Sequence, residues 1–354
     1  MRAAGVALLV FGLAACGGSS TSRGHDAGPQ QDVAAGDTAS PGDAPASADG
    51  PAQHDGAAQD DGPAATDGPG QVDSAPGADG SATYRNSLGV CWTDATCQRA
   101  MSIGHGGAWD AVSTPYDSNA AIINAYNIGM EGVKVDVRVT SDNVPVISHS
   151  SPITYYESVI CGLTGLVIED STAAQVTACL RFPSTTEHFQ RLDDVLNYVR
   201  GKMVVQLCVK RSQDYQRTID EIHALGAEDF AFIELGSAGE LQTIIPTLSN
   251  ADTVWYLVNV ASNVADVDTL IDVINNPRAF MYEFDPGVNV STLTPNRLHP
   301  AGVRSFTYDS TTGISVGTIQ GHFEGGYDVV SANNGPNNVQ ARQNVNTARG
   351  ISPP

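Results

Sequence analysis

The sequence predicts a parallel (β/α)8 barrel preceded by a disordered tether. From residue 99 onward, short β-branched runs alternate with amphipathic stretches, a pattern typical of parallel strands covered by helices. The unit recurs about eight times, and residues 84–354 are long enough for a single barrel of roughly 250 residues. The alternative is a doubly wound open sheet. Neither the count nor the order of elements excludes it, but the Gly-rich dinucleotide loop of that fold is missing from the sequence.

The N-terminus, residues 1–16, reads MRAAGVALLVFGLAAC. One basic residue precedes an apolar stretch at 6–13 that is too short to span a bilayer, which indicates an export signal. The ending LAAC resembles the lipobox of bacterial lipoproteins, which implies cleavage before Cys16 and lipidation of Cys16. That resemblance also implies a lipid-anchored protein of the bacterial cell envelope, with Gly17 favouring the outer membrane. The alternative is an ordinary secretory signal with an incidental cysteine.

Residues 17–83 form the predicted tether. They contain eleven Asp, one Arg and no Glu, and they cycle through Asp, Gly, Ala and Pro. Such a segment cannot bury enough apolar surface to offset the entropy of ordering, so we expect disorder, with like charges keeping it extended. The chain as a whole carries a formal charge of −21. This acidic balance argues against nucleic acid as a partner, because phosphate contacts require a surplus of Lys and Arg.

The strands expected after the tether, in chain order, are 101–105, 133–139, 144–148, 203–210, 230–235, 254–260, 280–285, 303–308 and 328–332. Helical patterns lie between most of them, the clearest at 118–129, 192–201 and 215–226. Each of these three ends on a glycine, the usual helix stop.

Side-chain alternation locates the expected site. In the strand VKVDVRV the valines share one face, while Lys134 and Asp136 share the other. The segment VVQLCVK likewise sets Gln206, Cys208 and Lys210 on one face. With the valines packed under helices, these polar side chains point into the barrel mouth, where the active sites of such barrels lie. The alternative is a satisfied polar layer without chemistry.

Five cysteines remain besides Cys16. Cys91 and Cys97 are six residues apart, Cys161 and Cys179 are eighteen apart, and Cys208 stands alone. In an oxidising compartment two local disulfides are expected, but the sequence does not give the pairing.

Three segments carry a family resemblance: IGHGG, PYDSNAAIINAYNIGMEGVKVDVRVTSDNVPVISH and RLDDVLNYVRGKMVVQLCVK. They resemble the glycerophosphodiester phosphodiesterase family of phospholipase C-like barrels. His105, Asp136, His149 and Lys210 occupy the family's motif places, with His149 thirteen residues beyond Asp136. SFTYD and GGYDVVSANN resemble its last two strands. The resemblance implies a phosphodiesterase in which His105 and His149 divide the acid and base work.

Four positions depart from the family pattern. Gly106 stands where the family has an arginine, and Tyr116, Lys134 and Cys208 stand where it has glutamates. In the family these glutamates and the aspartate hold a divalent cation, and only Asp136 remains here. One carboxylate beside an ammonium does not hold a hard cation, so we expect no metal cofactor at the family position.

The expected chemistry uses Lys134 and Lys210 as positive charge for the phosphate, with Asp136 orienting a lysine or a histidine. This resembles the metal-independent, phosphatidylinositol-specific bacterial phospholipases C, in which a basic side chain replaces a cation. Alternatively, Glu283 and Asp285 supply replacement oxygens for a cation. The expected partners are a small phosphodiester or a lysophospholipid, and the membrane through the lipidated cysteine.

A different class of function is also open: an inactive barrel that serves as a lipid-anchored binding module. The lost arginine and glutamates favour this alternative, whereas retention of both histidines disfavours it. Ser150 stands where the family has an aspartate after its second histidine, which removes an expected support for His149.

Overall fold

A computed structural model describes residues 83–110, 114–261, 267–274 and 276–352. The predicted signal peptide 1–16 with Cys16 lies outside these residues, as does the predicted tether except for its last residue, so these features remain predictions. Among the helices in the described ranges, none has the length and hydropathy that crossing a bilayer requires.

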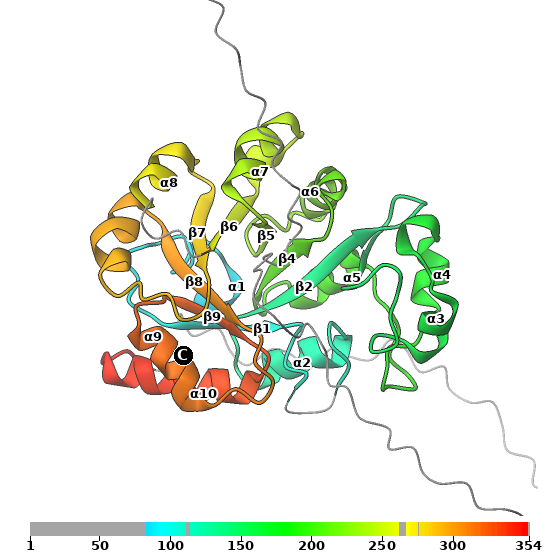
Figure 1. Cartoon of the computed structure of the whole chain (residues 1–354), viewed down its shortest axis with the longest axis horizontal. Helices are drawn as coiled ribbons and strands as arrows, with labels where there is room; N and C mark the ends of the chain where they lie inside the picture. Colours follow the sequence, from blue (N-terminus) through cyan, green and yellow to red (C-terminus); the bar gives the residue numbers. More distant parts are fainter. Residues whose placement is uncertain (1–82, 111–113, 262–266, 275, 353–354) are drawn as a thin grey trace, which may run out of the picture. The chain divides into compact units, whose positions relative to one another are not determined.

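Eight parallel strands close into a barrel (Figure 1). β1 pairs with β2 on one side and with β9 on the other, which closes the ring and excludes the open-sheet alternative. The barrel strands are β1 Met101–His105, β2 Gly132–Val139, β4 Val204–Val209, β5 Ala231–Leu235, β6 Trp255–Ala261, β7 Ala279–Phe284, β8 Arg304–Asp309 and β9 Val329–Ala332.

All nine expected strands are present, with ends within one residue of the expected ones. The strand expected at 144–148 differs from the others. It is β3, Pro145–Ile147, which runs antiparallel to β2 and lies outside the barrel ring. The physical reason is the short connection, because a tight turn after β2 can reverse the chain but cannot return it for a parallel pairing.

The helices of the described chain are α1 Thr83–Asn86, α2 Asn119–Asn127, α3 Val159–Thr164, α4 Ala173–Thr177, α5 Leu192–Val199, α6 Tyr215–Ala224, α7 Ala238–Thr243, α8 Val267–Ile274, α9 Val316–Glu324 and α10 Gly335–Ala348. The three expected helices are confirmed as α2, α5 and α6. The glycines that follow them, Gly129, Gly201 and Gly226, have positive φ, as expected of helix stops.

Two apolar cores lie on the two faces of the barrel strands. The outer core contains Val133, Val135 and Val137 of β2 together with residues of the surrounding helices. The inner core fills the barrel and includes Ile103 and Phe232. The valine face of β2 therefore packs outward, which confirms that Lys134 and Asp136 point into the barrel.

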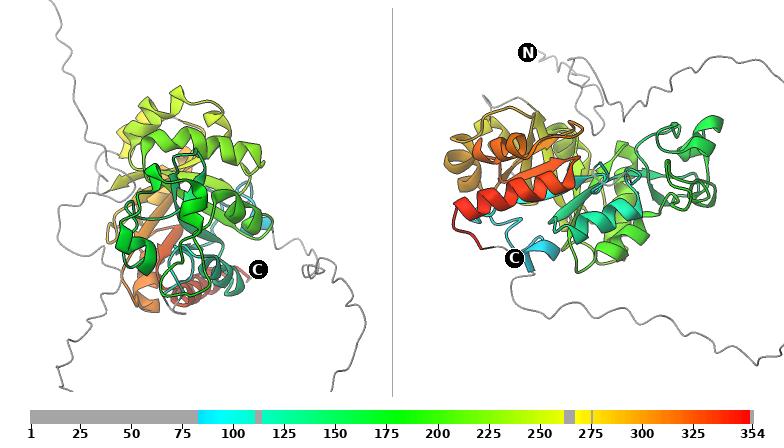
Figure 2. Two further views of the ribbon diagram at one scale, coloured as in Figure 1. Left: turned by 90° about the vertical axis from the view of Figure 1, so that its right-hand side faces the viewer. Right: turned by 90° about the horizontal axis from the view of Figure 1, so that it is seen from below.

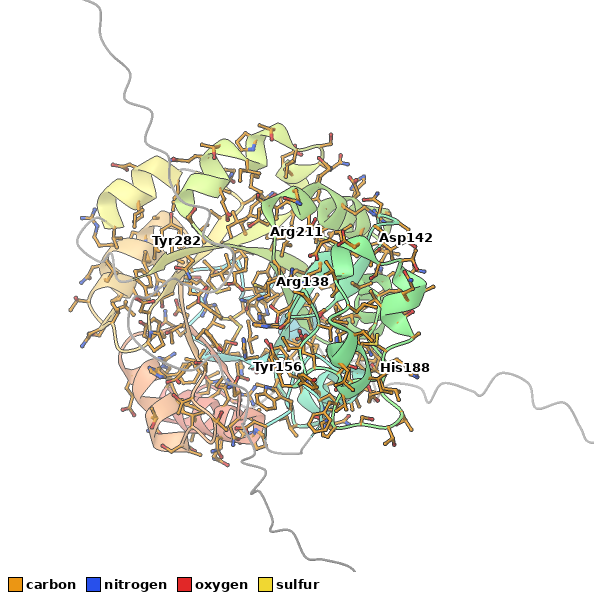
Figure 3. All side chains as sticks on the ribbon, turned by 45° about the vertical axis from the view of Figure 1, so that its right-hand side comes forward. Arg138, Asp142, Tyr156, His188, Arg211 and Tyr282 are labelled. Atoms are coloured by element: carbon orange, nitrogen blue, oxygen red, sulfur yellow. A yellow bond between two sulfur atoms is a disulfide. The ribbon has the colours of Figure 1, made fainter. Side chains whose placement is uncertain are left out.

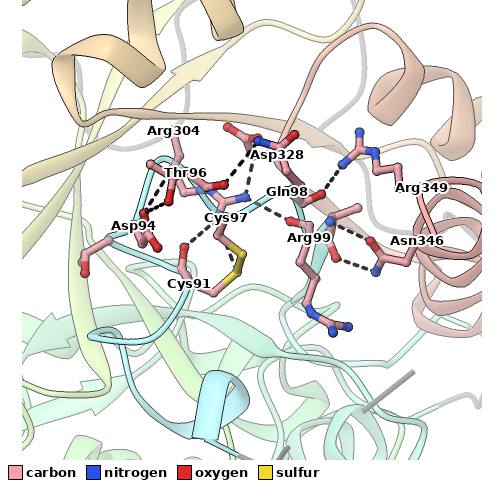
Figure 4. The surroundings of a disulfide bond; sticks show 12 residues. Cys91, Asp94, Thr96, Cys97, Gln98, Arg99, Arg304, Asp328, Asn346 and Arg349 are labelled. Atoms are coloured by element: carbon pink, nitrogen blue, oxygen red, sulfur yellow. Dashed lines mark hydrogen bonds and ion pairs between the residues drawn. A yellow bond between two sulfur atoms is a disulfide. The ribbon is translucent and has the colours of Figure 1, made fainter. Parts of the chain in front are cut away.

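The segment before β1, whose disulfide is drawn in Figure 4, packs against the inner core at the N-terminal end of the barrel. The Trp92 side chain is fully buried within the inner core, and a disulfide joins Cys91 to Cys97. The buried Arg304, first residue of β8, donates hydrogen bonds to the carbonyls of Cys91 at 2.5 Å and of Arg99 at 3.0 Å. The N-terminal end of the barrel is thus closed, so an active site can lie only at the C-terminal ends of the strands.

Between β3 and α5 the chain makes an excursion that carries α3 and α4 (Figure 2). It has a small apolar core of its own, which includes Ile153, Ile168 and Phe189. The second disulfide, Cys161 to Cys179, lies here, and Cys208 is a buried free thiol. The excursion starts after β3, whose last residue Ile147 lies opposite Val137 near the C-terminal end of β2, so it lies beside the open mouth.

Candidate active site

The barrel register brings four of the five residues singled out from the sequence to one side of the mouth. His105 ends β1 and lies opposite Lys134 of β2, while Asp136 lies opposite Cys208 of β4. Lys210 follows β4 directly, and its backbone N–H bonds the carbonyl of Val137. Because alternate residues face the same way, Lys134, Asp136 and Lys210 share the interior.

Asp136 is the centre of the cluster. Its Oδ1 lies 2.5 Å from Nζ of Lys134 and 2.7 Å from Nζ of Lys210, and its side chain is fully buried. Burial acts to raise the pKa of the Asp136 carboxyl, but the two ammonium groups outweigh it and hold that pKa well below its usual value. Burial likewise acts to lower the pKa of Lys134, and Asp136 reverses it, so that pKa is raised. Asp136 and Lys134 are therefore both charged at neutral pH.

Tyr116, at a family glutamate position, joins this cluster to the first histidine. Its hydroxyl donates to Oδ2 of Asp136 at 2.9 Å and accepts from Nζ of Lys134 at 3.1 Å. The same oxygen lies 3.1 Å from Nε2 of His105. Burial, and then Asp136, raise the pKa of the Tyr116 phenol well above its usual value, so it stays protonated.

Gly106 makes room for Tyr116. A Cβ at Gly106 would lie 2.1 Å from the Tyr116 ring, and the glycine has a φ of +63°, which side chains rarely adopt. The family arginine at this position is therefore incompatible with the tyrosine ring where it lies here. The two departures from the family pattern are one physical change: the ring occupies the space beside the loop that follows β1.

His105 is held in one tautomer. Its Nδ1 lies 2.8 Å from Oδ1 of Asn333, and the Asn333 amide nitrogen donates to the carbonyl of Ser310 at 2.6 Å, which orients the amide. Nδ1 therefore carries the proton and Nε2 is the acceptor. Burial, and then the Lys134 ammonium, lower the pKa of His105 well below its usual value, so the ring is neutral at pH 7. The ring stacks on Tyr308, with centroids 4.2 Å apart.

The His149 ring also lies beside that of Tyr116, with ring centroids 6.0 Å apart, and the corresponding distance from Tyr116 to His105 is 5.2 Å. The Tyr116 ring thus contacts both histidine rings, and Nζ of Lys134 lies 3.3 Å from Nε2 of His105. Burial lowers the pKa of His149, and Asp136 partly opposes this.

Residues of the excursion position His149. The Tyr156 hydroxyl lies 2.8 Å from its Nδ1, and Ser150 Oγ lies 3.4 Å from the same atom. The buried Glu157 accepts from the backbone N–H groups of His149 and Ser150, and the Arg138 side chain donates to the His149 carbonyl at 2.9 Å. Figure 3 labels Arg138 and Tyr156 on the barrel side of the excursion. Tyr156 thus supplies the support that the missing aspartate at position 150 would have given.

The residues at the family's metal position do not fit a hard divalent cation. A phenol, an ammonium and a thiol stand where glutamates would bind it, at Tyr116, Lys134 and Cys208. In the described part of the chain, no three His, Cys, Asp or Glu side chains are grouped so as to hold a metal ion. Glu283, considered above as a replacement ligand, is buried, and burial and then Glu234 raise its pKa well above the usual value, which makes it a neutral acid and a poor ligand.

Three supporting residues were not singled out from the sequence: Asn333, Tyr156 and Glu157. Asn333 directly follows β9, a position that could have pointed to it, since barrel sites gather at the carboxyl ends of strands. Tyr156 and Glu157 lie in a loop without any pattern, and only the folded excursion brings them to His149.

The fold is a (β/α)8 barrel, and two histidines and a lysine–aspartate cluster lie at its mouth. A sequence model of the glycerophosphoryl diester phosphodiesterase family matches residues 112–288, half of the chain. The chain therefore belongs to the glycerophosphoryl diester phosphodiesterase family, and this membership indicates a phosphodiesterase.

Solved structures agree on the fold. A glycerophosphoryl diester phosphodiesterase from Parabacteroides distasonis is 17% identical, with a TM-score of 0.59 over 75% of this chain and 92% of that one. One from Agrobacterium tumefaciens is 16% identical, with a TM-score of 0.55 over 68% and 99%. An Oleispira antarctica phosphodiesterase in complex with its product sn-glycerol-3-phosphate is 14% identical, with a TM-score of 0.54 over 71% and 99%. No curated protein matches the chain.

Proposed function

We propose that this protein hydrolyses glycerophosphodiesters or related phospholipid-derived diesters by two-histidine acid and base catalysis, without the family's divalent metal. The observation that carries the proposal is the charge of the buried cluster. Two ammonium groups, Lys134 and Lys210, share one carboxylate, Asp136, which leaves one net positive charge beside His105. A phosphodiester carries one negative charge, so the cluster matches it without a metal ion.

His105 suits the base. Its neutral ring, with the proton fixed on Nδ1, presents the Nε2 lone pair to the mouth. In the proposed first step a substrate hydroxyl adjacent to the phosphate gives its proton to Nε2, and its oxygen attacks phosphorus. The bond to the leaving alcohol breaks as a protonated His149 gives that oxygen a proton. A cyclic phosphodiester results, and water opens it with the two roles reversed.

His149 suits the acid. Among the described residues its ring hydrogen bonds are both at Nδ1, to the hydroxyls of Tyr156 and Ser150. Either oxygen can accept a hydrogen bond from Nδ1–H, so the charged ring is stabilised while Nε2–H faces the leaving group. Binding of the anionic diester raises the pKa of His149 from its lowered value, so that His149 is protonated when the leaving oxygen requires a proton.

The glycerophosphate substrate class is supported by the complex of the Oleispira antarctica phosphodiesterase with sn-glycerol-3-phosphate. We also propose that Cys16 is lipidated and that residues 17–83 tether the barrel of residues 84–354 to a bacterial envelope membrane, the outer one if Gly17 acts as in other lipoproteins. The sequence ending LAAC supports this part of the proposal.

The second candidate function is an inactive, lipid-anchored binding module. One observation favours it: Nε2 of His105 is already within hydrogen-bond reach of Tyr116 and Lys134, so a substrate hydroxyl must displace one of them.

The two candidates are separated by assaying the full chain on glycerophosphocholine and on a bis-aryl phosphodiester. We expect His105→Ala and His149→Ala each to lower kcat/KM by about 10²–10⁴-fold, the usual contribution of a proton-transfer group. His223→Ala is the matched control, because His223 is exposed and pairs only with Glu228 among the described residues. No turnover by the folded wild-type chain, or equal turnover in all variants, would favour the binding module.

A further inference from the structure

The excursion beside the active site carries an exposed apolar surface. Six large side chains on it are exposed, with fractions of 60% for Tyr155, 61% for Ile160 and 63% for Leu163. We call these six residues the apolar face: Tyr155, Tyr156, Val159, Ile160, Leu163 and Phe182. Soluble proteins rarely gather such side chains without a binding role.

The apolar face is held rigidly. Ser158 caps the N-terminus of α3, Gly165 ends the helix in the left-handed conformation, and the disulfide of Cys161 ties it to Cys179 after α4. Gly162 presses against the backbone of Thr154, since a Cβ there would lie 2.9 Å from it. This contact fixes which side of α3 (Figure 1) faces the protein, and Val159, Ile160 and Leu163 of the helix are exposed.

The apolar face is continuous with the active site. Tyr156 is exposed, yet its hydroxyl lies 2.8 Å from Nδ1 of His149. The backbone N–H of Phe182 bonds the carbonyl of Glu157, whose carboxylate holds the backbone of His149. A molecule that covers the apolar face therefore lies next to the diester whose leaving oxygen His149 would protonate.

The few charged residues around the apolar face indicate which kind of lipid surface it can bind. From Ser151 to Ile168 the only charged residue is Glu157, and it is buried. This neutral stretch lies in a chain of formal charge −21. Anionic membranes attract clusters of Lys and Arg, and none is present here, whereas tyrosines with aliphatic residues suit the boundary between lipid head groups and acyl chains.

We propose that the apolar face is an interfacial docking surface for a zwitterionic phospholipid layer, from which the active site takes a diester that still carries an acyl chain. The inference rests on the proposed function, because an enzyme whose substrate is a lipid-derived diester must bring its active site close to the lipid layer. Insertion of the aliphatic side chains at the head-group boundary would supply the binding energy. Tyr156 would then join the lipid-facing surface to His149.

Binding to phosphatidylcholine vesicles, measured by sedimentation, tests the proposal. All proteins are the full chain with Cys16→Ser, so that no lipid anchor contributes. We expect Ile160→Asp with Leu163→Asp to weaken binding about tenfold for each side chain, from the loss of one buried aliphatic group each. Val159→Asp against Val90→Asp is a matched pair, since these valines are 44% and 42% exposed.

Val90 is a suitable control because it lies at the sealed end of the barrel, next to Cys91, whose carbonyl accepts from Arg304. We expect Val90→Asp to leave vesicle binding unchanged and Val159→Asp to weaken it. Circular dichroism and turnover of soluble glycerophosphocholine check that each variant is folded.

The outcomes separate this inference from the proposed function. Absent vesicle binding by a chain that hydrolyses soluble diesters overturns the docking surface and leaves the function standing. Vesicle binding that depends on the apolar face, in a chain without turnover, supports the surface and overturns the function. Equal binding by all variants overturns the docking surface. So does a wild-type dimer that Ile160→Asp dissociates, because the face would then bind a second copy of the chain.

Discussion

Removal of the Lys134 ammonium is the perturbation that reaches both the stability and the chemistry of the site. Lys134→Met keeps most of the aliphatic stem and deletes a charge that is 5% exposed. Nζ contacts Asp136 at 2.5 Å, the Tyr116 hydroxyl at 3.1 Å and Nε2 of His105 at 3.3 Å. The variant therefore changes the surroundings of three buried groups at once.

The expected loss of unfolding free energy depends on Lys210, the ammonium partner that Asp136 keeps in this variant. Breaking a buried ion pair costs about 3–5 kcal/mol when the other charge is left alone. Lys210 stays 2.7 Å from the same Asp136 oxygen, so we expect the lower end, about 3 kcal/mol. For a domain of this size that is a fall in Tm of about 6–12 °C. The double variant Lys134→Met with Asp136→Asn should lose less unfolding free energy than the sum of the losses in the two single variants, because the two groups interact directly.

The expected effect on chemistry has two parts. Loss of a preorganised positive charge should lower kcat by about 10²–10³-fold. The pKa of His105, which burial and then Lys134 hold below its usual value, should rise, so the acid limb of the pH profile should move to higher pH.

Scanning calorimetry at pH 7, a pH profile of kcat/KM and an NMR titration of His105 measure these effects. Lys202→Met is the matched control, because Lys202 donates to the carbonyl of Tyr198 and lies over its ring, at the far end of the barrel from the site. A kcat within threefold of wild type, or an unmoved His105 titration, would refute the role given to Lys134.

Three further predictions concern the same site. Gly106→Ala should destabilise the fold by several kcal/mol, about 1 of which is the cost of positive φ and the rest the collision with Tyr116, so Tyr116→Ala should rescue only part of it in thermal unfolding. The pKa values of His105 and His149 are both lowered, so the proposed base stays deprotonated, and the proposed acid loses its proton, at a lower pH than an ordinary histidine would. The value of kcat/KM should therefore peak below pH 6.5, and a peak above pH 7.5 would contradict the proposed roles. Tyr116→Glu, Lys134→Glu and Cys208→Glu together should create affinity for Ca²⁺, seen by calorimetry, and an unchanged affinity would contradict the alignment of these positions.

The fold was predictable because its determinants are local. The valine alternation of β2 and the glycine stops after α2, α5 and α6 are visible in single segments, and the strand ends lie within one residue of those expected. The antiparallel pairing of β3 was not predictable from its own residues, since a short β-branched run has the same residue pattern in a parallel and in an antiparallel strand.

The site was predictable only in part. Lys134, Asp136 and the two histidines follow from alternation and motif spacing. The central place of Tyr116 does not, because it depends on space above Gly106 that only the loop after β1 creates. The support of His149 by Tyr156 depends on how the disulfide-linked excursion folds back, and no local pattern encodes that.

The central claim is that the Lys134 ammonium replaces the family's divalent cation as the positive charge beside the phosphate. The dependence of turnover on added metal tests this claim most directly. The full chain is assayed on glycerophosphocholine in EDTA, then after dialysis with Mg²⁺ or Ca²⁺ restored. The account predicts the same kcat/KM under all three conditions. Turnover that disappears in EDTA and returns with either cation would contradict it.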